Sequence, residues 1–338
     1  MISTEVSKRS GKLSQSILIF ILGVMAVIVA ILARTHFPGG ELRAISTVFM
    51  FVALSQAWNI IGGFTGYASF GQVVFFGMGG YLTAVVMLKY HFDFWSALIL
   101  SGFFAAAFAV IIGQPLLKLK GHYFAIATLG IAEGMREVVI NLPDLTGGGA
   151  GISVPIAGKF AKTQYFGDSG FYLLFLALAV IAVIVGILVS KNKFGYGLRA
   201  IHQNEDAAAA IGINTVKSKV LAYALSAFLT GIVGATYVFQ QITIFPERLF
   251  DVEITVLMIM MVVIGGSGTI LGPLLGALGL QFISEYLREH FTNAHTFILG
   301  GIIILAVILI PQGAVNYFRE GRRTKNYSLL ANIRRYRL

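Results

Sequence analysis

The sequence predicts an all-α membrane protein with about ten transmembrane or re-entrant helices. Three observations predict this class. Hydrophobic residues make up 57% of the 338 residues and charged residues only 12%, whereas soluble domains carry about 25% charged residues. The apolar residues form separate runs, most of them near the ~20 residues that a helix needs to cross the hydrocarbon core. The basic residues gather in alternate connections between these runs.

The chain divides into one membrane domain and two basic tails. Residues 1–16 and 312–338 form the predicted cytoplasmic tails, and residues 17–311 form the membrane domain. The first apolar run is about 17 residues, longer than the ~7–15 of a signal peptide, and no A-x-A site follows it, so it predicts an uncleaved helix. The predicted membrane segments are 17–33, 43–62, 64–89, 95–118, 121–141, 169–190, 217–241, 253–269, 271–290 and 295–311.

Two of these segments are weaker candidates than the rest. The segment at 121–141 contains charged residues, and the segment at 253–269 ends in the sequence GGSG. Both are therefore less secure as membrane spans than the other segments.

The charge distribution predicts the orientation. The chain carries 25 Lys and Arg residues and a net charge of +10. Placing the N-terminus inside puts most of these basic residues on the cytoplasmic side, as the positive-inside rule requires, with ten crossings and both termini inside. Arg34 and Arg43 are local exceptions. The basic residues placed inside are Lys8, Arg9, Lys12, Lys118, Lys120, Lys191, Lys193, Arg199, Lys217, Lys219, Arg319, Arg322, Arg323, Lys325, Arg334, Arg335 and Arg337.

The sequence contains no recognisable catalytic or metal-binding pattern. There is no cysteine, so disulfides and thiolate ligands are excluded. The six histidines form no HExxH pair. Neither the GxxxxGK[ST] phosphate loop nor the GxSxG elbow occurs, so we expect no catalytic residue, no metal and no cofactor on this chain.

Charged and amide side chains within the apolar segments are the exceptions to the lipid-like composition. A charge at the centre of a membrane helix costs ~2.5–3.5 kcal/mol on insertion scales. Glu133 and Arg136 are three residues apart, which predicts an intramembrane ion pair on one helix face; a substrate-facing role is the alternative. Asn59 and Gln72 are expected either to bond neighbouring helices or to line a passage.

Glycine clusters interrupt the apolar pattern in both halves of the chain, at residues 62–72 (GGFTGYASFGQ) and 265–279 (GGSGTILGPLLGALG). Interrupted helices in corresponding halves mark substrate routes in transporters. The second cluster also places Gly268, Gly272 and Gly276 four residues apart, as in close helix packing. Packing and passage both remain open for it.

A polar, alanine-rich stretch at residues 190–219 separates two strongly apolar segments. Asn204 precedes Glu205 and Asp206, which suits a helix cap and an acidic first turn, and Gly212 suits the helix end. The stretch therefore predicts a short cytoplasmic helix. Its alanines would present a low-relief surface that fits a groove on another protein; a plain connecting loop is the alternative.

The sequence GYGLRAIHQNEDAAAAIGIN (195–214) resembles the cytoplasmic coupling segment of ABC importer permeases. The spacing of Asp206, Ala207, Ala208 and Gly212 is similar to their E-A-A-x3-G motif, with Asp in place of Glu. The distal I-x-L-P part of that motif is absent at the expected distance.

Four stretches in order, spanning most of residues 50–290, resemble the branched-chain amino acid ABC transporter permeases, on the LivM-like side of the LivH/LivM pair. The coupling stretch is one of them. The others are ALSQAWNIIGGFTGYASFGQVVFFGMGGYLTAV (53–85), GHYFAIATLGIAEGMREVVIN with LTGGGAGI (121–152), and LMIMMVVIGGSGTILGPLLGA (257–277). The tails carry no resemblance.

The resemblance implies an ABC importer permease fold in the bacterial inner membrane. The implied partners are a second, LivH-like permease subunit, two ABC ATPase subunits that bind ATP and magnesium, and a periplasmic or lipid-anchored substrate-binding protein; no nucleic acid is expected. The residues implied for ATPase coupling are Gly195, Gly197, Arg199, Ala200, Glu205, Asp206, Ala207, Ala208 and Gly212. The candidates for the passage are Asn59, Gln72, Phe75, Gly265, Gly266 and Gly268.

Other functions remain possible from the sequence. The same machine could carry amides, urea or aromatic acids. A secondary transporter would need an ion-coupling carboxylate at mid-membrane, for which Glu133 is the one candidate, and Arg136 stands beside it. A membrane enzyme would need a nucleophile or metal set that the sequence does not offer.

Overall fold

The computed structural model describes residues 39–156, 162–291 and 294–324. The predicted segment 17–33, the N-terminal tail and the part of the C-terminal tail after residue 324 lie outside the described residues. The elements are α2 (Gly39–Thr65), α3 (Gln72–Lys89), α4 (Phe94–Leu116), α5 (His122–Ile140), α6 (Pro143–Thr146), β1 (Ile152–Ser153), α7 (Gly167–Lys191), α8 (Lys193–Gln203), α9 (Glu205–Ala210), α10 (Thr215–Gln241), β2 (Thr243–Ile244), α11 (Pro246–Leu249), α12 (Val252–Gly265), α13 (Leu271–His290), α14 (His295–Leu309) and α15 (Ala314–Thr324).

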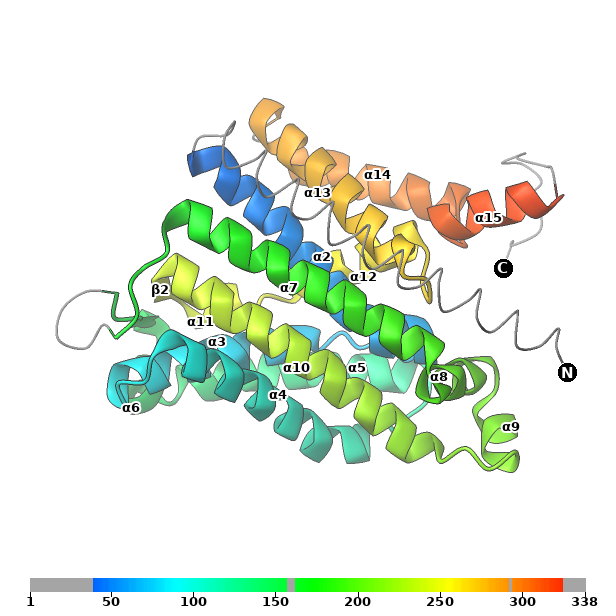
Figure 1. Ribbon diagram of the computed structural model, residues 1–338, viewed down its shortest axis with the longest axis horizontal. Helices are drawn as coiled ribbons and strands as arrows, with labels where there is room; N and C mark the ends of the chain where they lie inside the picture. Colours follow the sequence, from blue (N-terminus) through cyan, green and yellow to red (C-terminus); the bar gives the residue numbers. More distant parts are fainter. Residues whose placement is uncertain (1–38, 157–161, 292–293, 325–338) are drawn as a thin grey trace, which may run out of the picture.

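Helix α10 packs against α2, α3 and α4 in the centre of the bundle (Figure 1). Small residues bring the backbones close together. A β-carbon on Gly79 of α3 would lie 2.2 Å from the carbonyl oxygen of Gly231, and one on Gly234 would lie 2.1 Å from that of Phe76. Close approach through glycine is typical of helix packing in membranes, where no hydrophobic driving force acts between helices.

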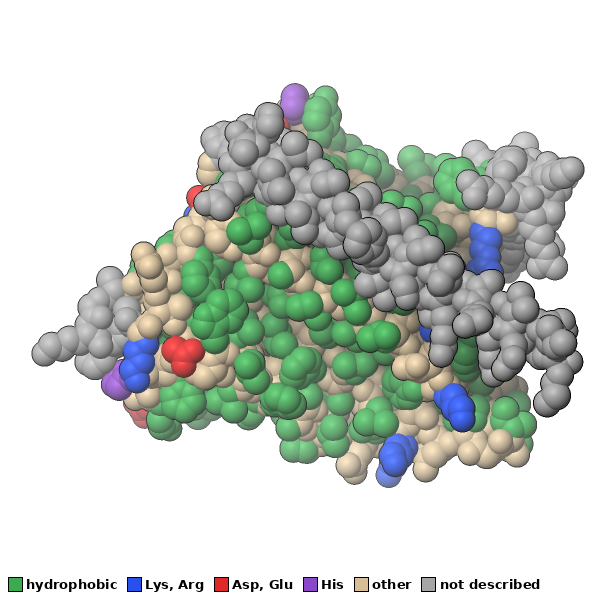
Figure 2. Space-filling view, viewed as in Figure 1, with side chains coloured by type: hydrophobic (Ala, Val, Ile, Leu, Met, Phe, Trp, Pro, Cys, Tyr) green, Lys and Arg blue, Asp and Glu red, His purple; other side chains and the backbone are tan. Residues whose placement is uncertain are grey.

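The two ends of the bundle differ in structure (Figure 1). At one end Arg43 of α2 pairs with Asp168 of α7 at 3.0 Å, and the short strands β1 and β2 pair antiparallel. At the other end α8 and α9 follow α7. We call this second end, with the last turn of α4 and the first turns of α10, the α8–α9 end. Figure 2 shows hydrophobic side chains over the middle of one face, with Lys, Arg, Asp and Glu toward the two ends.

Both glycine clusters form non-helical breaks. Residues 66–71 separate α2 from α3, and residues 266–270 separate α12 from α13. The second break is the turn of a tight antiparallel pair, because a β-carbon on Gly276 would lie 1.9 Å from the carbonyl oxygen of Met261 and one on Gly265 would lie 1.9 Å from that of Gly272. In this structure the glycines of the second cluster therefore allow α12 and α13 to pack closely. Their role in a passage stays a prediction.

Six helices among the described residues are long and apolar enough to cross a membrane. They lie at Gly39–Thr65, Gln72–Lys89, Phe94–Leu116, Gly167–Lys191, Thr215–Gln241 and His295–Arg319, the last span comprising α14 and the start of α15. Helix α12 has 14 residues, which at 1.5 Å per residue is about 21 Å and too short for the ~30 Å hydrocarbon core. Helices α5 and α13 form where helices were expected but do not meet the same criteria. The helical membrane class is confirmed, and the count of ten crossings stays a prediction.

Candidate functional site

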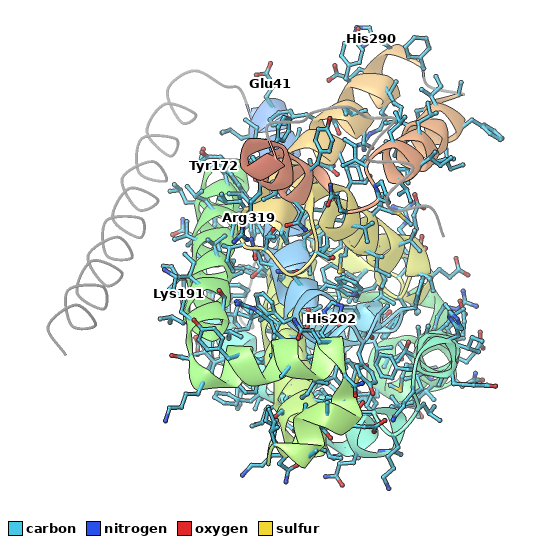
Figure 3. The ribbon with its side chains drawn as sticks, turned by 90° about the vertical axis from the view of Figure 1, so that its right-hand side faces the viewer. Glu41, Tyr172, Lys191, His202, His290 and Arg319 are labelled. Atoms are coloured by element: carbon cyan, nitrogen blue, oxygen red, sulfur yellow. The ribbon has the colours of Figure 1, made fainter. Side chains whose placement is uncertain are left out.

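Two helices, rather than one, occupy the polar stretch at residues 190–219. Helix α8 begins at Lys193, two residues after the end of α7, and crosses the end of the bundle. Figure 3 looks onto this end, with Lys191 and His202 near the two ends of α8. The sharp connection requires glycine, because a β-carbon on Gly195 would lie 1.9 Å from the carbonyl oxygen of Val189. Leu198 and Ile201 are buried on the inner face of α8. This helix was not predicted.

Arg199 fastens α8 to the end of α7. Its Nη2 donates to the carbonyl oxygen of Ser190 at 2.7 Å and contacts the Ser190 hydroxyl at 3.0 Å. Its guanidinium also lies over the rings of Phe64 and Tyr196, with centroid distances of 5.5 and 5.6 Å. A cation near the last carbonyls of a helix is favourable. Arg199 therefore holds the elbow between α7 and α8 in place.

Helix α9 begins and ends where the sequence predicts. The Asn204 side chain accepts a hydrogen bond from the amide of Ala207 at 2.9 Å. Gly212 has a left-handed backbone with φ of 89°, and its amide donates to the carbonyl of Ala209 at 2.9 Å. A residue with a side chain would be strained there. The cap and the glycine stop together produce a helix of six residues.

The outward face of α9 is small and apolar. We call this face the α9 knob; it comprises the exposed residues Asp206, Ala207, Ala209, Ala210, Ile211 and Gly212. Ile211 is 75% exposed and is the largest apolar side chain of the knob. Asp206 forms an exposed ion pair with Lys120 at 3.2 Å, and such pairs contribute little to stability.

Several residues expected to touch a partner instead face the bundle. Ala208 is 2% exposed, because its helix position turns it toward α8 and α10. Gly195 is buried, and Arg199 and Glu205 are bonded within the chain. Gly197 and Ala200 are half-buried. Of the nine residues predicted for ATPase coupling, Asp206, Ala207 and Gly212 face outward in this structure, next to the exposed Ala209, Ala210 and Ile211. Contact of the nine residues with an ATPase stays a prediction.

A buried lysine connects α9 to the bundle. Lys219 of α10 is 2% exposed, and its Nζ lies 2.6 Å from Oε1 of Glu205, at the start of α9. The same Nζ donates to the Tyr67 hydroxyl at 2.9 Å and to the carbonyl oxygen of Leu117 at 2.7 Å. The Tyr67 hydroxyl donates to Oε2 of Glu205 at 2.5 Å. Burial by itself raises the pKa of Glu205, but the hydrogen bonds from Lys219 and Tyr67 outweigh burial and hold the pKa below its usual value.

Lys219 and Tyr67 are not among the residues that the sequence predicts to be functional. Lys219 was counted only as a cytoplasmic charge. Its position at the end of the polar stretch 190–219, where a cytoplasmic lysine is ordinary, gives no sequence signal for burial. No sequence spacing identifies Tyr67 as its partner, since 152 positions separate it from Lys219. His202 Nδ1 lies 3.2 Å from the carbonyl oxygen of Gly63.

The predicted passage residues lie within the packed bundle. Asn59 holds the second break, since its Nδ2 donates to the carbonyl of Thr269 at 2.8 Å and its Oδ1 accepts from the amide of Gly268 at 3.0 Å. Gln72 Nε2 lies 2.8 Å from the hydroxyls of Ser226 and Thr230 on α10.

Phe75 and Gly266 are two further residues predicted to line the passage. Phe75 is fully buried and packs edge-on against Tyr223. Gly266 ends α12 with φ of 122°, which its turn requires. The passage candidates thus come together around α2, α10 and the second break.

Glu133 and Arg136 lie side by side on α5. Arg136 Nη2 is 2.9 Å from Glu133 Oε2, and it also lies 3.5 Å from Glu137 Oε1. The three side chains are between 34% and 58% exposed, so the charges are on the outside of this chain's bundle.

Among the described residues, six apolar helices with α10 packed between α2, α3 and α4, and a small helical elbow at one end, define a helical membrane protein that crosses the bilayer several times. A family model described as "Branched-chain amino acid transport system / permease component" matches residues 40–307. The chain therefore belongs to this family of ABC transporter permeases, whose members are transport subunits and not enzymes.

Individual relatives support this membership. The high-affinity branched-chain amino acid transport system permease protein LivM of Escherichia coli (strain K12) is 28% identical over 310 residues, covering 85% of this chain and 72% of the relative. The probable LivM of Methanocaldococcus jannaschii is 26% identical, covering 65% and 67%. The ribose import permease protein RbsC of Bacillus subtilis is 26% identical, covering 58% and 60%. No solved structure matches this chain.

Proposed function

We propose that this chain is one permease subunit of an ABC importer for branched-chain or other hydrophobic amino acids in the bacterial cytoplasmic membrane. The α9 knob carries this proposal. A surface of alanines and one exposed isoleucine fits a groove on another protein. Its helix α9 is held to the bundle by Glu205, and the preceding helix α8 is held to α7 by Arg199. ATP hydrolysis would take place on ATPase subunits that receive the knob, and this chain would bind no cofactor itself.

Charge supports placing the α8–α9 end in the cytoplasm. Basic residues concentrate there among the described residues, as the positive-inside rule predicts for a cytoplasmic end. They are Lys118, Lys120, Lys191, Lys193, Arg199, Lys217 and Lys219. With this orientation, ten crossings and both termini inside remain our proposal for the complete chain.

The proposed partners follow from the family and from the outer face of α5. Charges exposed to lipid are costly, so we propose that Glu133, Arg136 and Glu137 face a second permease subunit or the passage between the two subunits. A probable LivH permease protein of Methanocaldococcus jannaschii is also similar, at 28% identity over 58% of this chain. A substrate-binding protein would dock at the end opposite α8 and α9.

The share of this chain that each relative matches favours amino acids over sugars as the transported substrate. The Escherichia coli LivM match covers 85% of this chain, whereas the ribose and arabinose permeases match 58% and 62% of it at 24–26% identity. Uptake of radiolabelled leucine by cells that express the complete transporter should be inhibited by excess isoleucine or valine. Inhibition by ribose, arabinose or urea, with none by isoleucine, would instead assign one of those substrate classes.

Ala209→Arg tests the α9 knob, because it places a long charged side chain on the face that would enter the ATPase groove. ATP-dependent leucine uptake should fall at least tenfold, which corresponds to about 1.4 kcal/mol of lost coupling. Ala209→Ser keeps the side chain small and should retain uptake close to that of the wild type. Membrane levels, measured by immunoblot, should be equal. Normal uptake with Ala209→Arg would contradict the proposed docking.

Ala209 is a sharper position for this test than Ala208. Because Ala208 is buried against the bundle, an arginine there would disturb folding whether or not an ATPase binds. Ala209 is exposed, so its substitution changes the outward surface alone.

A further inference from the structure

The ammonium group of Lys219 uses its complete hydrogen-bonding capacity inside the protein. An ammonium has three N–H donors, and Nζ has three acceptors: Glu205 Oε1 at 2.6 Å, the Tyr67 hydroxyl at 2.9 Å and the Leu117 carbonyl at 2.7 Å. It also lies 4.4 Å from the centre of the Tyr67 ring. A buried cation is tolerated only when paired and hydrogen-bonded in this way. Moving any one partner away therefore leaves a buried charge uncompensated.

The four groups come from four different elements. Glu205 is the first residue of α9, Lys219 lies in the second turn of α10, and Leu117 follows the end of α4. Tyr67 belongs to the non-helical break at 66–71, between α2 and α3. The network thus joins the short helix that carries the α9 knob to the break in the membrane helices.

Glu205 is the principal connection between α9 and the bundle. Helix α9 is described completely, and Ala208 is the one residue in it that is fully buried. Asp206 pairs with Lys120 in an exposed position. Glu205, in contrast, uses both carboxylate oxygens on buried or half-buried partners. A displacement of α9 would therefore move the Glu205 carboxylate relative to its partners Lys219 and Tyr67 inside the bundle.

The break at 66–71 is in turn bonded to several membrane helices. Trp58 Nε1 of α2 donates to the carbonyl oxygen of Ser69 at 2.8 Å. The amide of Phe70 donates to the Thr128 hydroxyl of α5 at 3.0 Å. The break also leads directly into Gln72, which bonds Ser226 and Thr230 of α10. A shift at Tyr67 is consequently passed to α2, α5 and α10.

We propose that Glu205, Lys219 and Tyr67 form a transmission link that couples the position of α9 to the break between α2 and α3. This inference rests on the proposed function, in which an ATPase moves α9. The three side chains are positioning residues: they contact neither substrate nor nucleotide. Because removing one partner would strand a buried charge, the three groups move together, and the break follows α9 when the ATPases close.

The test is the number of substrate molecules transported per ATP hydrolysed, measured with the complete transporter in proteoliposomes. Tyr67→Phe removes one hydroxyl and keeps the ring, so we expect the complex to assemble and hydrolyse ATP at a rate near that of the wild type. Transport per ATP should fall at least about tenfold, because the charged hydrogen bonds that join Glu205 to the break are lost.

Further variants separate transmission from folding. Lys219→Met combined with Glu205→Gln removes both charges and leaves no unpaired ion, and it should show the same low transport per ATP. Lys217→Met, the matched control at an exposed lysine of the same helix, should leave transport per ATP unchanged. A purely structural role would lower hydrolysis and transport in proportion and keep their ratio constant. A constant ratio in Tyr67→Phe and in the double variant would overturn the transmission link.

Failure of the proposed function has a different signature. If no ATPase associates with the wild-type chain, or if wild-type proteoliposomes transport leucine without ATP, the ABC importer proposal fails and the transmission link fails with it. If wild-type transport is ATP-driven but the variants keep the wild-type ratio, the transmission link alone fails.

Discussion

Single amide side chains hold the breaks in this bundle together. Asn59 satisfies one carbonyl and one amide of the stretch at 266–270, and Gln56 Nε2 donates to the carbonyl oxygen of Ile270 at 2.7 Å. Backbone groups outside helices have no partner in lipid, so side chains of neighbouring helices must supply one. Asn59 and Gln56 are polar residues in the apolar segment at 43–62 because they bond the backbone of the stretch at 266–270.

Replacing Asn59 with leucine tests this role. Asn59→Leu leaves the half-buried carbonyl of Thr269 and the half-buried amide of Gly268 without this partner, and a fully buried group left unsatisfied costs about 1–3 kcal/mol. The free energy of unfolding in detergent should therefore fall by roughly 2 kcal/mol or more. Asn141→Ala is the control, because the Asn141 amide is exposed and bonds only Glu137 of its own helix. Equal stability of the two variants would show that Asn59 does not hold the break.

At the scale of elements, α3, α4 and α10 form the most tightly joined part of the bundle. Gly79, Gly231 and Gly234 place the backbones of α3 and α10 in direct contact, and the buried hydroxyls of Thr83 on α3 and Ser101 on α4 lie 2.7 Å apart. Helix α14, in contrast, has no fully buried residue. Among the described residues, the elements therefore range from a closely packed centre to an exposed edge at α14.

The same substitution should have opposite effects at two glycines. Gly234→Ala places a methyl group 2.1 Å from a backbone oxygen of α3, so the helices must separate, and we expect a loss of about 1–3 kcal/mol. Gly130→Ala on α5 meets no atom within 4 Å and should be neutral or stabilising by up to ~1 kcal/mol. Thermal unfolding of the purified chain measures both. A stable Gly234→Ala variant would contradict the close packing of α3 and α10.

At the scale of the whole molecule, the orientation in the membrane is open to a direct measurement. The chain has no cysteine, so each introduced cysteine is the only thiol. Ala210 lies on the α9 knob, and Ala150 is exposed near β1 at the opposite end. A membrane-impermeant thiol reagent should label Ala150→Cys in intact spheroplasts and Ala210→Cys only after permeabilisation. The cysteine-free wild type measures background labelling. The reverse pattern would invert the proposed topology.

The sequence by itself determined the helical membrane class, the positions of most helices and the ends of α9. These features depend on local information: the length of an apolar run, the cap at Asn204 and the glycine at 212 act within a few residues of where they stand. The resemblance to the permease family could also be read from stretches that keep their order along the chain.

The tertiary structure alone decided which side chains of the α9 region face outward and which face the bundle. Ala208 and Ala209 are adjacent residues of the same type, and only the packing of α9 on α8 and α10 makes the first buried and the second exposed. The association of Lys219 with Tyr67 and Glu205 was likewise invisible in the sequence, because it depends on how four separate elements meet at one end of the bundle. The partners of a buried charge are brought together only when the whole chain folds, and no local sequence pattern shows which residues they are.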